Sequence, residues 1–252
     1  MIRPLGRAAS AALTFTLLAG CAGPATSPTP RRTVPPPAAT AWELPSLAPD
    51  EVAFATSDGL TIIGTLRGKG RIGVILGHMF GGQASDWMPL ADALAEAGYA
   101  VLAINFRGNG RSEPPLQTPL LHLDIEAAAR FLQARGVTDI VLVGASMGGA
   151  AVLDAANVVG AVALVAMAAP NNFGGLQLTD EKIAELSMPK LFIVSDGDLV
   201  RLQFDLVIAA APAPKEEMRP PGNAHGTRLF EGEQRDAVIE RITTFLAVNA
   251  GP

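Results

Sequence analysis

Short apolar runs recur along this chain, and stretches whose apolar residues have helical spacing separate them. Runs such as AVLAIN, IVLVG, AVALVAM and LFIV are apolar at almost every position, so neither side of such a strand can face water. Strands of this kind belong inside a parallel sheet that helices cover on both sides. With 252 residues, the chain is long enough for one such domain and its core. We therefore expect a single α/β domain with a mostly parallel, doubly wound sheet of about eight strands.

The positions of the expected elements follow from the same pattern. Ser57-Asp58-Gly59 is a turn signal, so an antiparallel hairpin is expected to open the domain. Strands are expected at residues 51–55, 60–66, 71–76, 100–104, 139–143, 161–167 and 190–194. Helices are expected at residues 86–97, 120–135, 147–159, 179–186, 201–210 and 236–248.

Residues 1–20 have the layout of an export signal. Two arginines precede an apolar run at residues 8–19, which is too short to span a bilayer as a helix. Residues 18–21, Leu-Ala-Gly-Cys, resemble the lipobox of bacterial lipoproteins, in which cleavage before the cysteine leaves that cysteine to carry lipid. The sequence thus predicts a lipoprotein signal peptide at residues 1–20 and lipidation of Cys21. The implied location is the cell envelope, where the lipid anchors the protein to the outer side of a bacterial membrane.

The segment after the cysteine differs in composition from the rest of the chain. Residues 21–46 are rich in Pro, Ala and Thr and have almost no apolar periodicity. That composition is typical of a semi-extended tether. The folded domain is expected to occupy residues 47–252.

The charge of the chain limits the partners and cofactors that it can bind. Acidic residues outnumber basic ones by 24 to 19, whereas nucleic-acid binding needs clustered Lys and Arg, so no nucleic-acid partner is expected. Three scattered histidines and one cysteine form no metal-ligand pattern, and residues 144–149 lack the start of a dinucleotide fingerprint. We therefore expect no metal and no other cofactor, and the sequence indicates no oligomeric state.

Residues 144–148 form the pattern Gly-x-Ser-x-Gly between a buried strand and a helix. In this strand–turn–helix context the serine of the pattern, Ser146, is a candidate nucleophile. So sharp a turn forces neighbouring backbone close together, and side chains at Gly144 and Gly148 would collide. The turn places the serine at the N-terminus of the helix, where the helix dipole and free N–H groups favour a developing negative charge.

A serine hydroxyl needs a base to take its proton, and that base is usually a histidine oriented by a carboxylate. In this strand–turn–helix architecture both partners follow the serine in the chain. His225 is therefore the candidate base, since the other two histidines precede the serine. The strand at residues 190–194 leads into Asp196 and Asp198. We assign the acid to Asp198, with Asp196 as the alternative; the Asp-Gly-Asp sequence is also good turn chemistry.

Taken together, these stretches resemble the α/β-hydrolase family from about residue 51 to residue 248. The matching segments are residues 77–82, 106–112, 144–149, 195–198 and 224–226. In that family the loop after the third strand and the residue after the nucleophile each supply one N–H to the oxyanion. The resemblance assigns these N–H groups to Phe80, with Met79 as the alternative, and to Met147. It also implies that His78 braces the loop as a structural histidine.

Two further expectations follow from the resemblance. Arg107 and Arg111 could form a clamp for an anionic substrate, but the matching segment of the family is a structural loop, and we prefer that interpretation. The family inserts its cap domain after the strand that ends near residue 169, and this chain has only residues 170–178 there, so no large lid is expected. A site without a lid favours small or flat acyl substrates.

The predicted function is hydrolysis of small-molecule carboxylic esters through an acyl-enzyme. Ser146 is the expected nucleophile, His225 the general base and then acid, and Asp198 the residue that orients the imidazole. Two alternatives remain. An acyltransferase would use the same triad with an acceptor alcohol or amine in place of water, and a non-catalytic envelope-binding protein could keep the same fold.

Overall fold

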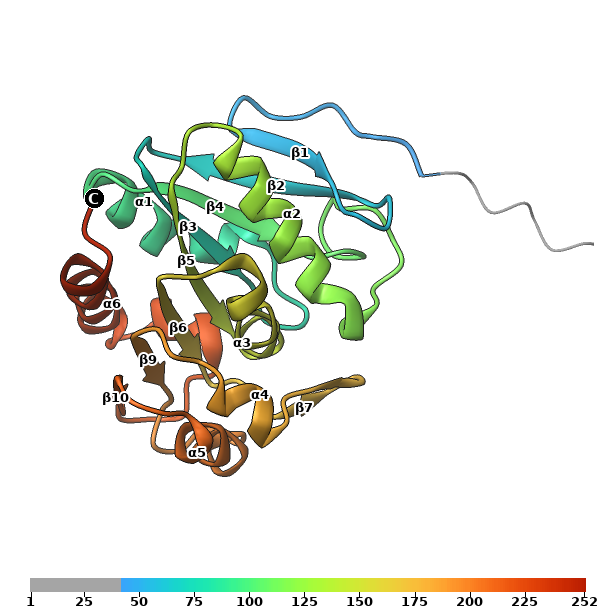
Figure 1. Ribbon diagram of the computed structural model, residues 1–252. Coiled ribbons are helices and arrows are strands. Elements are labelled where there is room, and N and C mark those ends of the chain that lie inside the picture. The colour runs from blue at the N-terminus through green and yellow to red at the C-terminus, as the bar shows by residue number, and fades with distance from the viewer. Residues whose placement is uncertain (1–41) are drawn as a thin grey trace, which may run out of the picture. The chain divides into compact units, whose positions relative to one another are not determined.

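An eight-stranded sheet forms the centre of the fold (Figure 1). The computed structural model describes residues 42–252. The strands of the sheet are β1 (Glu51–Ala55), β2 (Thr61–Arg67), β3 (Ile72–Gly77), β4 (Ala100–Asn105), β5 (Asp139–Ala145), β6 (Ala163–Met167), β9 (Lys190–Ile193) and β10 (Lys215–Met218). Their order is β1-β2-β4-β3-β5-β6-β9-β10. The pairs β1–β2 and β2–β4 are antiparallel and all the others are parallel, which confirms the predicted sheet.

Helices cover both faces of the sheet (Figure 1). The α-helices are α1 (Met88–Glu96), α2 (Leu121–Gln133), α3 (Met147–Val159), α4 (Asp180–Ala184), α5 (Arg201–Ala210) and α6 (Arg235–Asn249). Three short 3-10 helices are η1 (Ala84–Trp87), η2 (Thr118–Leu120) and η3 (Gly226–Phe230). Apolar side chains of α2, α3 and α5 pack on one face, and those of α1 and α6 pack on the other.

The central strands supply side chains to both layers because successive residues of a strand point to opposite faces. In β5, Leu142 packs with the α2–α3 layer, whereas Val141 and Val143 pack with the α1–α6 layer. All three are fully buried, as the apolar runs of the sequence require. Because β3, β5, β6 and β9 are parallel, their carboxyl ends lie at one edge of the sheet, and the loops after them can meet there.

Two features of the fold were not expected from the sequence. The edge strand β10 reads Lys-Glu-Glu-Met, with both glutamates exposed, and it pairs only with β9. An edge strand needs no apolar face, so apolar periodicity does not reveal it. The second feature is a small hairpin, β7 (Asn172–Phe173) and β8 (Leu176–Gln177), between β6 and α4. This hairpin is the only regular structure before α4 in the segment where a lid could have been inserted, in agreement with the expected lack of a large lid.

The predictions for the amino-terminal part lie outside the described residues. They comprise the signal peptide at residues 1–20, the lipid on Cys21 and most of the tether at residues 21–46. Within residues 42–252, none of the helices combines the length and the apolarity needed to cross a membrane.

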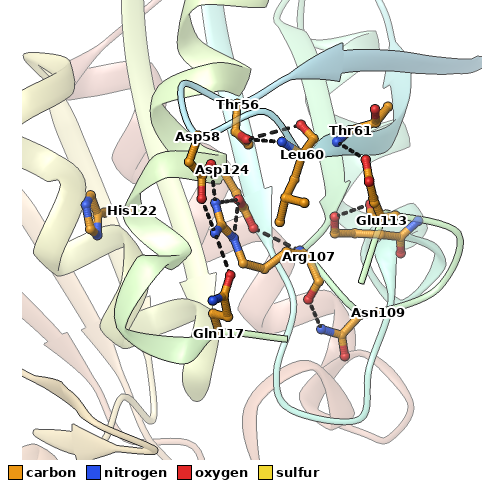
Figure 2. A network of polar contacts seen from close by, with 12 residues as sticks. Thr56, Asp58, Leu60, Thr61, Arg107, Asn109, Glu113, Gln117, His122 and Asp124 are labelled. Atoms are coloured by element: carbon orange, nitrogen blue, oxygen red, sulfur yellow. Dashed lines mark hydrogen bonds and ion pairs between the residues drawn. The ribbon is translucent and has the colours of Figure 1, made fainter. Parts of the chain in front are cut away.

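A buried arginine ties the loop after β4 to the rest of the domain (Figure 2). The side chain of Arg107 is fully buried, and its guanidinium lies 2.7 Å from a carboxylate oxygen of Asp124 and 2.7 Å from one of Asp58. The Arg107 backbone N–H also donates to Asp124 over 2.9 Å. With its guanidinium held by two carboxylates, Arg107 is not available to clamp a substrate. Arg111 pairs with Glu51, so this loop is structural, as the resemblance implied.

Asp58 makes the fold sensitive to acid. The hydrogen bond from Arg107 lowers the pKa of the Asp58 carboxyl from 3.8 to about 2. A group whose folded-state pKa is depressed contributes stability above its unfolded pKa and loses it as the pH falls toward the folded value. We expect Asp58→Asn to lower the free energy of unfolding at neutral pH by up to about 1 kcal/mol, since solvent screens this exposed partner. The difference from the parent should shrink between pH 3.8 and about 2, measured by urea unfolding at each pH. A difference that stays constant across this range would contradict the assignment.

Candidate active site

Ser146 lies on the sharp turn between β5 and α3. Its backbone has φ +51° and ψ −118°, in the region that residues other than glycine rarely adopt. The Ser146 N–H donates to the carbonyl of Met167, at the end of the neighbouring strand β6, over 2.8 Å. This bond and the start of α3 hold the strained conformation in place, and such strain is concentrated at functional sites.

The two glycines of the pattern are required by close backbone approach. A Cβ at Gly144 would come 2.2 Å from the carbonyl oxygen of Gly148. A Cβ at Gly148 would come 2.2 Å from the carbonyl oxygen of Gly77, at the end of β3. Neither obstacle is a flexible side chain, so no substitution at these positions fits without moving the turn. This is the packing that the pattern Gly-x-Ser-x-Gly predicted.

The structure brings Asp198 and His225 together at the carboxyl edge of the sheet. The Nδ1 atom of His225 lies 2.9 Å from one carboxylate oxygen of Asp198 and 3.1 Å from the other. The Asp198 side chain is 1% exposed, and it also accepts the backbone N–H of Val200 over 2.9 Å. Because a carboxylate can only accept, this contact places the imidazole proton on Nδ1 and leaves Nε2 free to take a proton.

Three hydrogen bonds join the loop after β9 to the loop that carries His225. The N–H of Asp196 donates to Pro220 over 3.0 Å, and the N–H of Gly197 donates to Gly222 over 2.8 Å. The Ser195 hydroxyl donates to the carbonyl of Ala224 over 2.7 Å. These bonds tie the two loops together and help to hold the carboxylate in line with the imidazole. The sequence did not predict that Ser195 joins these two loops, because no sequence motif marks this role.

The same geometry separates the two candidate acids. Asp198 points into the fold and meets His225, whereas the neighbouring Asp196 is exposed and lines a different hollow with Arg201 and Arg219. The two side chains point in different directions because the chain turns between them. In this turn the Asp198 N–H donates to the carbonyl of Ser195 over 3.1 Å. The geometry thus favours Asp198 over Asp196 as the partner of the imidazole.

Ser146 lies near this pair without being bonded to it. Gly226, the residue after His225, packs against Ala145, the residue before Ser146, so closely that a Cβ on Gly226 would lie 3.3 Å from the Ala145 Cβ. Ser146 is 7% exposed, and its hydroxyl forms no hydrogen bond with any residue between 42 and 252. A hydrogen bond between nucleophile and base is often long in an unliganded site and tightens when substrate binds. The contact between Gly226 and Ala145 thus places His225 and Ser146 next to each other in the fold.

Backbone N–H groups around the serine are available to an oxyanion. Met147 is the first residue of α3, and Phe80 lies in the loop after β3. Neither their N–H groups nor that of Met79 donates to an acceptor within the part of the chain that the structure describes. Their lack of an acceptor is compatible with the predicted pair Phe80 and Met147, and Met79 stays an alternative to Phe80. The Phe80 ring, which is 58% exposed, contacts the Phe173 ring of the β7–β8 hairpin at 5.5 Å between centroids.

His78 braces the loop that carries these N–H groups. Its Nε2 atom accepts the N–H of Phe106 over 3.1 Å, so the ring proton is on Nδ1, which donates to the carbonyl of Met79 over 2.7 Å. Burial lowers the pKa of His78, which keeps the imidazole neutral. The histidine joins the loop after β3 to the loop after β4, in the structural role that the sequence suggested.

A cleft of about 650 Å³ opens beside His225. Its lining residues are Met79, Phe80, Gly197, Asp198, Leu199, Val200, Asn223, Ala224, His225 and Arg228. Most of this surface is apolar, and three of the predicted site residues, Phe80, Asp198 and His225, contribute to it. Ser146 and Met147 are buried at the start of α3 and do not line it. Within residues 42–252, no three His, Cys, Asp or Glu side chains group in a way that could hold a metal ion.

Comparison with known proteins agrees with this architecture. A sequence model of the alpha/beta hydrolase family matches residues 74–247, which include the serine turn, both candidate acids and His225. The chain is 29% identical over 196 residues to a thermostable monoacylglycerol lipase of a Bacillus species, covering 65% of this chain and 77% of the lipase. It is 34% identical over 122 residues to the dihydrolipoyllysine-residue acetyltransferase component of an acetoin cleaving system from Cupriavidus necator. That match spans 48% of this chain but only 32% of the acetyltransferase component.

Solved structures with the same fold include known esterases. An esterase from Pyrococcus furiosus superimposes with a TM-score of 0.68 at 19% identity, covering 80% of this chain and 91% of the esterase. The protein Est1E of Butyrivibrio proteoclasticus, solved with ferulic acid bound, gives a TM-score of 0.68 at 17% identity, with 79% and 99% covered. At these identities the likeness concerns the fold alone. The eight-stranded sheet, the serine turn and the extent of the family match together lead to one conclusion: this chain is a member of the alpha/beta hydrolase family.

Proposed function

We propose that this protein is a serine hydrolase that cleaves carboxylic esters through an acyl-enzyme. The observation that carries the proposal is the bond from His225 to the buried carboxylate of Asp198, on a cleft next to the strained turn of Ser146. A buried carboxylate that fixes the imidazole tautomer is what a general base for serine needs. The names of the lipase and the esterases to which the chain is similar support an ester as the bond that is cleaved.

In the proposed first half-reaction, the Ser146 hydroxyl attacks the ester carbonyl while His225 Nε2 takes the hydroxyl proton. The negative charge that develops on the carbonyl oxygen is stabilised by the N–H groups of Phe80 and Met147. When the tetrahedral intermediate collapses, the bond to the alcohol breaks and the alcohol leaves with the proton from His225. Asp198 stabilises the transient imidazolium without itself taking the proton.

In the second half-reaction, water attacks the acyl group on Ser146 while His225 Nε2 removes a proton from the water. Collapse of this second intermediate returns the proton to the serine oxygen and releases the carboxylic acid. Only the short β7–β8 hairpin stands before α4 where a lid domain could have been inserted, so water is proposed to enter without a domain movement. The open, largely apolar cleft favours small or flat substrates.

A partition experiment tests the acyl-enzyme. Esters that share one acyl group but differ in their leaving alcohols are hydrolysed in the presence of a fixed concentration of methanol. If all of them pass through the same acyl group on Ser146, the ratio of methyl ester to free acid must be identical for every leaving group. A ratio that varies with the leaving group would contradict a common intermediate and would favour direct attack of water on the substrate.

An acyltransferase is the second candidate, because one similar protein is named as an acetyltransferase component. Its reaction would differ only in the acceptor that attacks the acyl group on Ser146. The same partition experiment separates the two activities. A hydrolase gives mostly free acid when the acceptor alcohol is dilute, whereas a transferase gives mostly the new ester.

The proposed enzyme is anchored in the cell envelope by lipid on Cys21. Support for this part comes from the sequence of residues 1–21 alone. Expressed in a bacterium, the full chain is expected in the membrane fraction, and Cys21→Ser is expected to lose its lipid and with it this anchorage. Mass spectrometry of the mature amino terminus gives the readout. An unmodified Cys21 in the parent protein would contradict the anchor.

A further inference from the structure

One charged residue of the cleft takes no part in the mechanism described above. Arg228 lines the cleft three residues after His225. Among the lining residues, the charged groups are Asp198, which is bonded to His225, and Arg228. Within residues 42–252, the Arg228 guanidinium forms no ion pair with any carboxylate. Glu233, which shares a smaller neighbouring hollow with Arg228, does not reach it either.

The backbone under Arg228 is held rigidly. Arg228 belongs to η3, whose residues Leu229 and Phe230 are buried in the α1–α6 layer, with the Phe230 ring 5.5 Å from that of Trp87. The Arg228 N–H donates to the carbonyl of His225 over 3.1 Å. Arg228 itself is exposed, so its guanidinium is solvated and accessible from the cleft. The fold therefore fixes the position of the Arg228 backbone relative to His225, and the side chain starts from a constant point at the cleft.

The charges around Arg228 indicate which kind of substrate its guanidinium could attract. The chain has five more acidic than basic residues, so its overall charge repels an anionic substrate. At the cleft, positive charge prevails over negative charge, because the carboxylate of Asp198 is 1% exposed and already bonded to His225. Phe80, Leu199 and Val200, which line the same cleft, provide an apolar wall. A planar guanidinium beside an apolar wall is suited to a molecule with an apolar body and a carboxylate.

We propose that Arg228 selects esters that carry a carboxylate in addition to the ester bond. The apolar body of such a substrate packs on Phe80 and Leu199, while its carboxylate binds the Arg228 guanidinium and its ester carbonyl faces Ser146. This inference rests on the proposed ester hydrolysis and names its substrate class. Arg228 acts in binding and takes no part in proton transfer.

Matched pairs of esters test the selection. On the alcohol side, para-acetoxybenzoate is compared with para-acetoxybenzamide, which has nearly the same shape but no charge. On the acyl side, the p-nitrophenyl ester of adipic acid is compared with the mixed ester in which its free carboxyl is methylated. In at least one pair, the parent should prefer the acid by about tenfold in kcat/KM, the size expected for one hydrogen bond to a charged group. The preference should fall with added salt.

Three variants assign the preference to this side chain. Arg228→Gln is expected to bring the acid-to-neutral ratio of kcat/KM close to one, and Arg228→Lys is expected to restore part of it. Arg71→Gln removes the same charge at the opposite edge of the sheet, where β3 begins, and should keep the parent's ratio. A preference that survives Arg228→Gln, or a parent without any preference, would overturn the inference while ester hydrolysis stands. A parent that cleaves no member of either pair would overturn the proposed function, and this inference with it.

Discussion

Ser146→Ala is expected to lower kcat for p-nitrophenyl acetate by about 10⁴-fold or more. Alanine removes the attacking oxygen, so no acyl-enzyme can form, and only binding and the oxyanion N–H groups are left to act on the ester. The side chain is small and makes no hydrogen bond within the described residues, so its loss should leave the fold intact. Steady-state kinetics on the purified domain, with circular dichroism to check folding, gives the measurement.

The matched control is another serine that lies away from the cleft. Ser187 is exposed in the segment before β9, and Ser187→Ala should keep the parent's kcat. If folded Ser146→Ala retained the parent's rate, or if Ser187→Ala lost it, the nucleophile would lie elsewhere. Contaminating esterase from the expression host is excluded by purifying parent and variants in parallel.

Asp198→Asn should have an effect of similar size, lowering kcat by about 10⁴-fold. The new amide would donate to Nδ1 of His225, which forces the imidazole proton onto Nε2 and removes the lone pair that takes the serine proton. The Asp198 side chain is 1% exposed, so water cannot readily take its place as the partner of Nδ1. The asparagine is nearly the same size as the aspartate, so the geometry of the loop should persist.

Asp196→Asn is the matched comparison for this variant. Asp196 is exposed and lies in a different hollow, so its replacement should change kcat by less than about threefold, as a change of one solvated charge would. Both variants are measured across a range of pH, because the loss in Asp198→Asn should persist at every pH where the fold is stable. Similar losses in both variants, or a larger loss at Asp196, would contradict the assignment of the acid.

The central sheet could be predicted from the sequence because the inner strands are buried on both faces and must be apolar. The helix α3 was predicted with its observed bounds, since the serine turn fixes its start and Gly160, with φ +64°, ends it. The edge strand β10 was missed because its residues Glu216 and Glu217 face solvent. Its position is decided by pairing with β9, which is a contact between distant parts of the chain.

Part of the candidate site, too, could be predicted from the sequence, and part could not. The order of Ser146, Asp198 and His225 along the chain could be read from local signals, because each residue follows a strand or precedes a helix. The choice between Asp196 and Asp198 could not be read from the sequence. Both are carboxylates in the same turn after β9, and only the direction of each side chain distinguishes them. Arg228 was not singled out at all, because a lone arginine in a polar loop has no motif; its position beside His225 emerges only when η3 packs on the sheet.

Activation of one serine by the His225–Asp198 pair is the central requirement of the proposed catalysis. A fluorophosphonate reacts far faster with an activated serine hydroxyl than with an ordinary one, so it tests this point without knowledge of the substrate. After labelling of the intact domain, peptide mass spectrometry should find the phosphonyl group on Ser146 alone, and Asp198→Asn should label far more slowly than the parent. A parent protein that stays unlabelled, or that carries the label on another residue, would contradict the account.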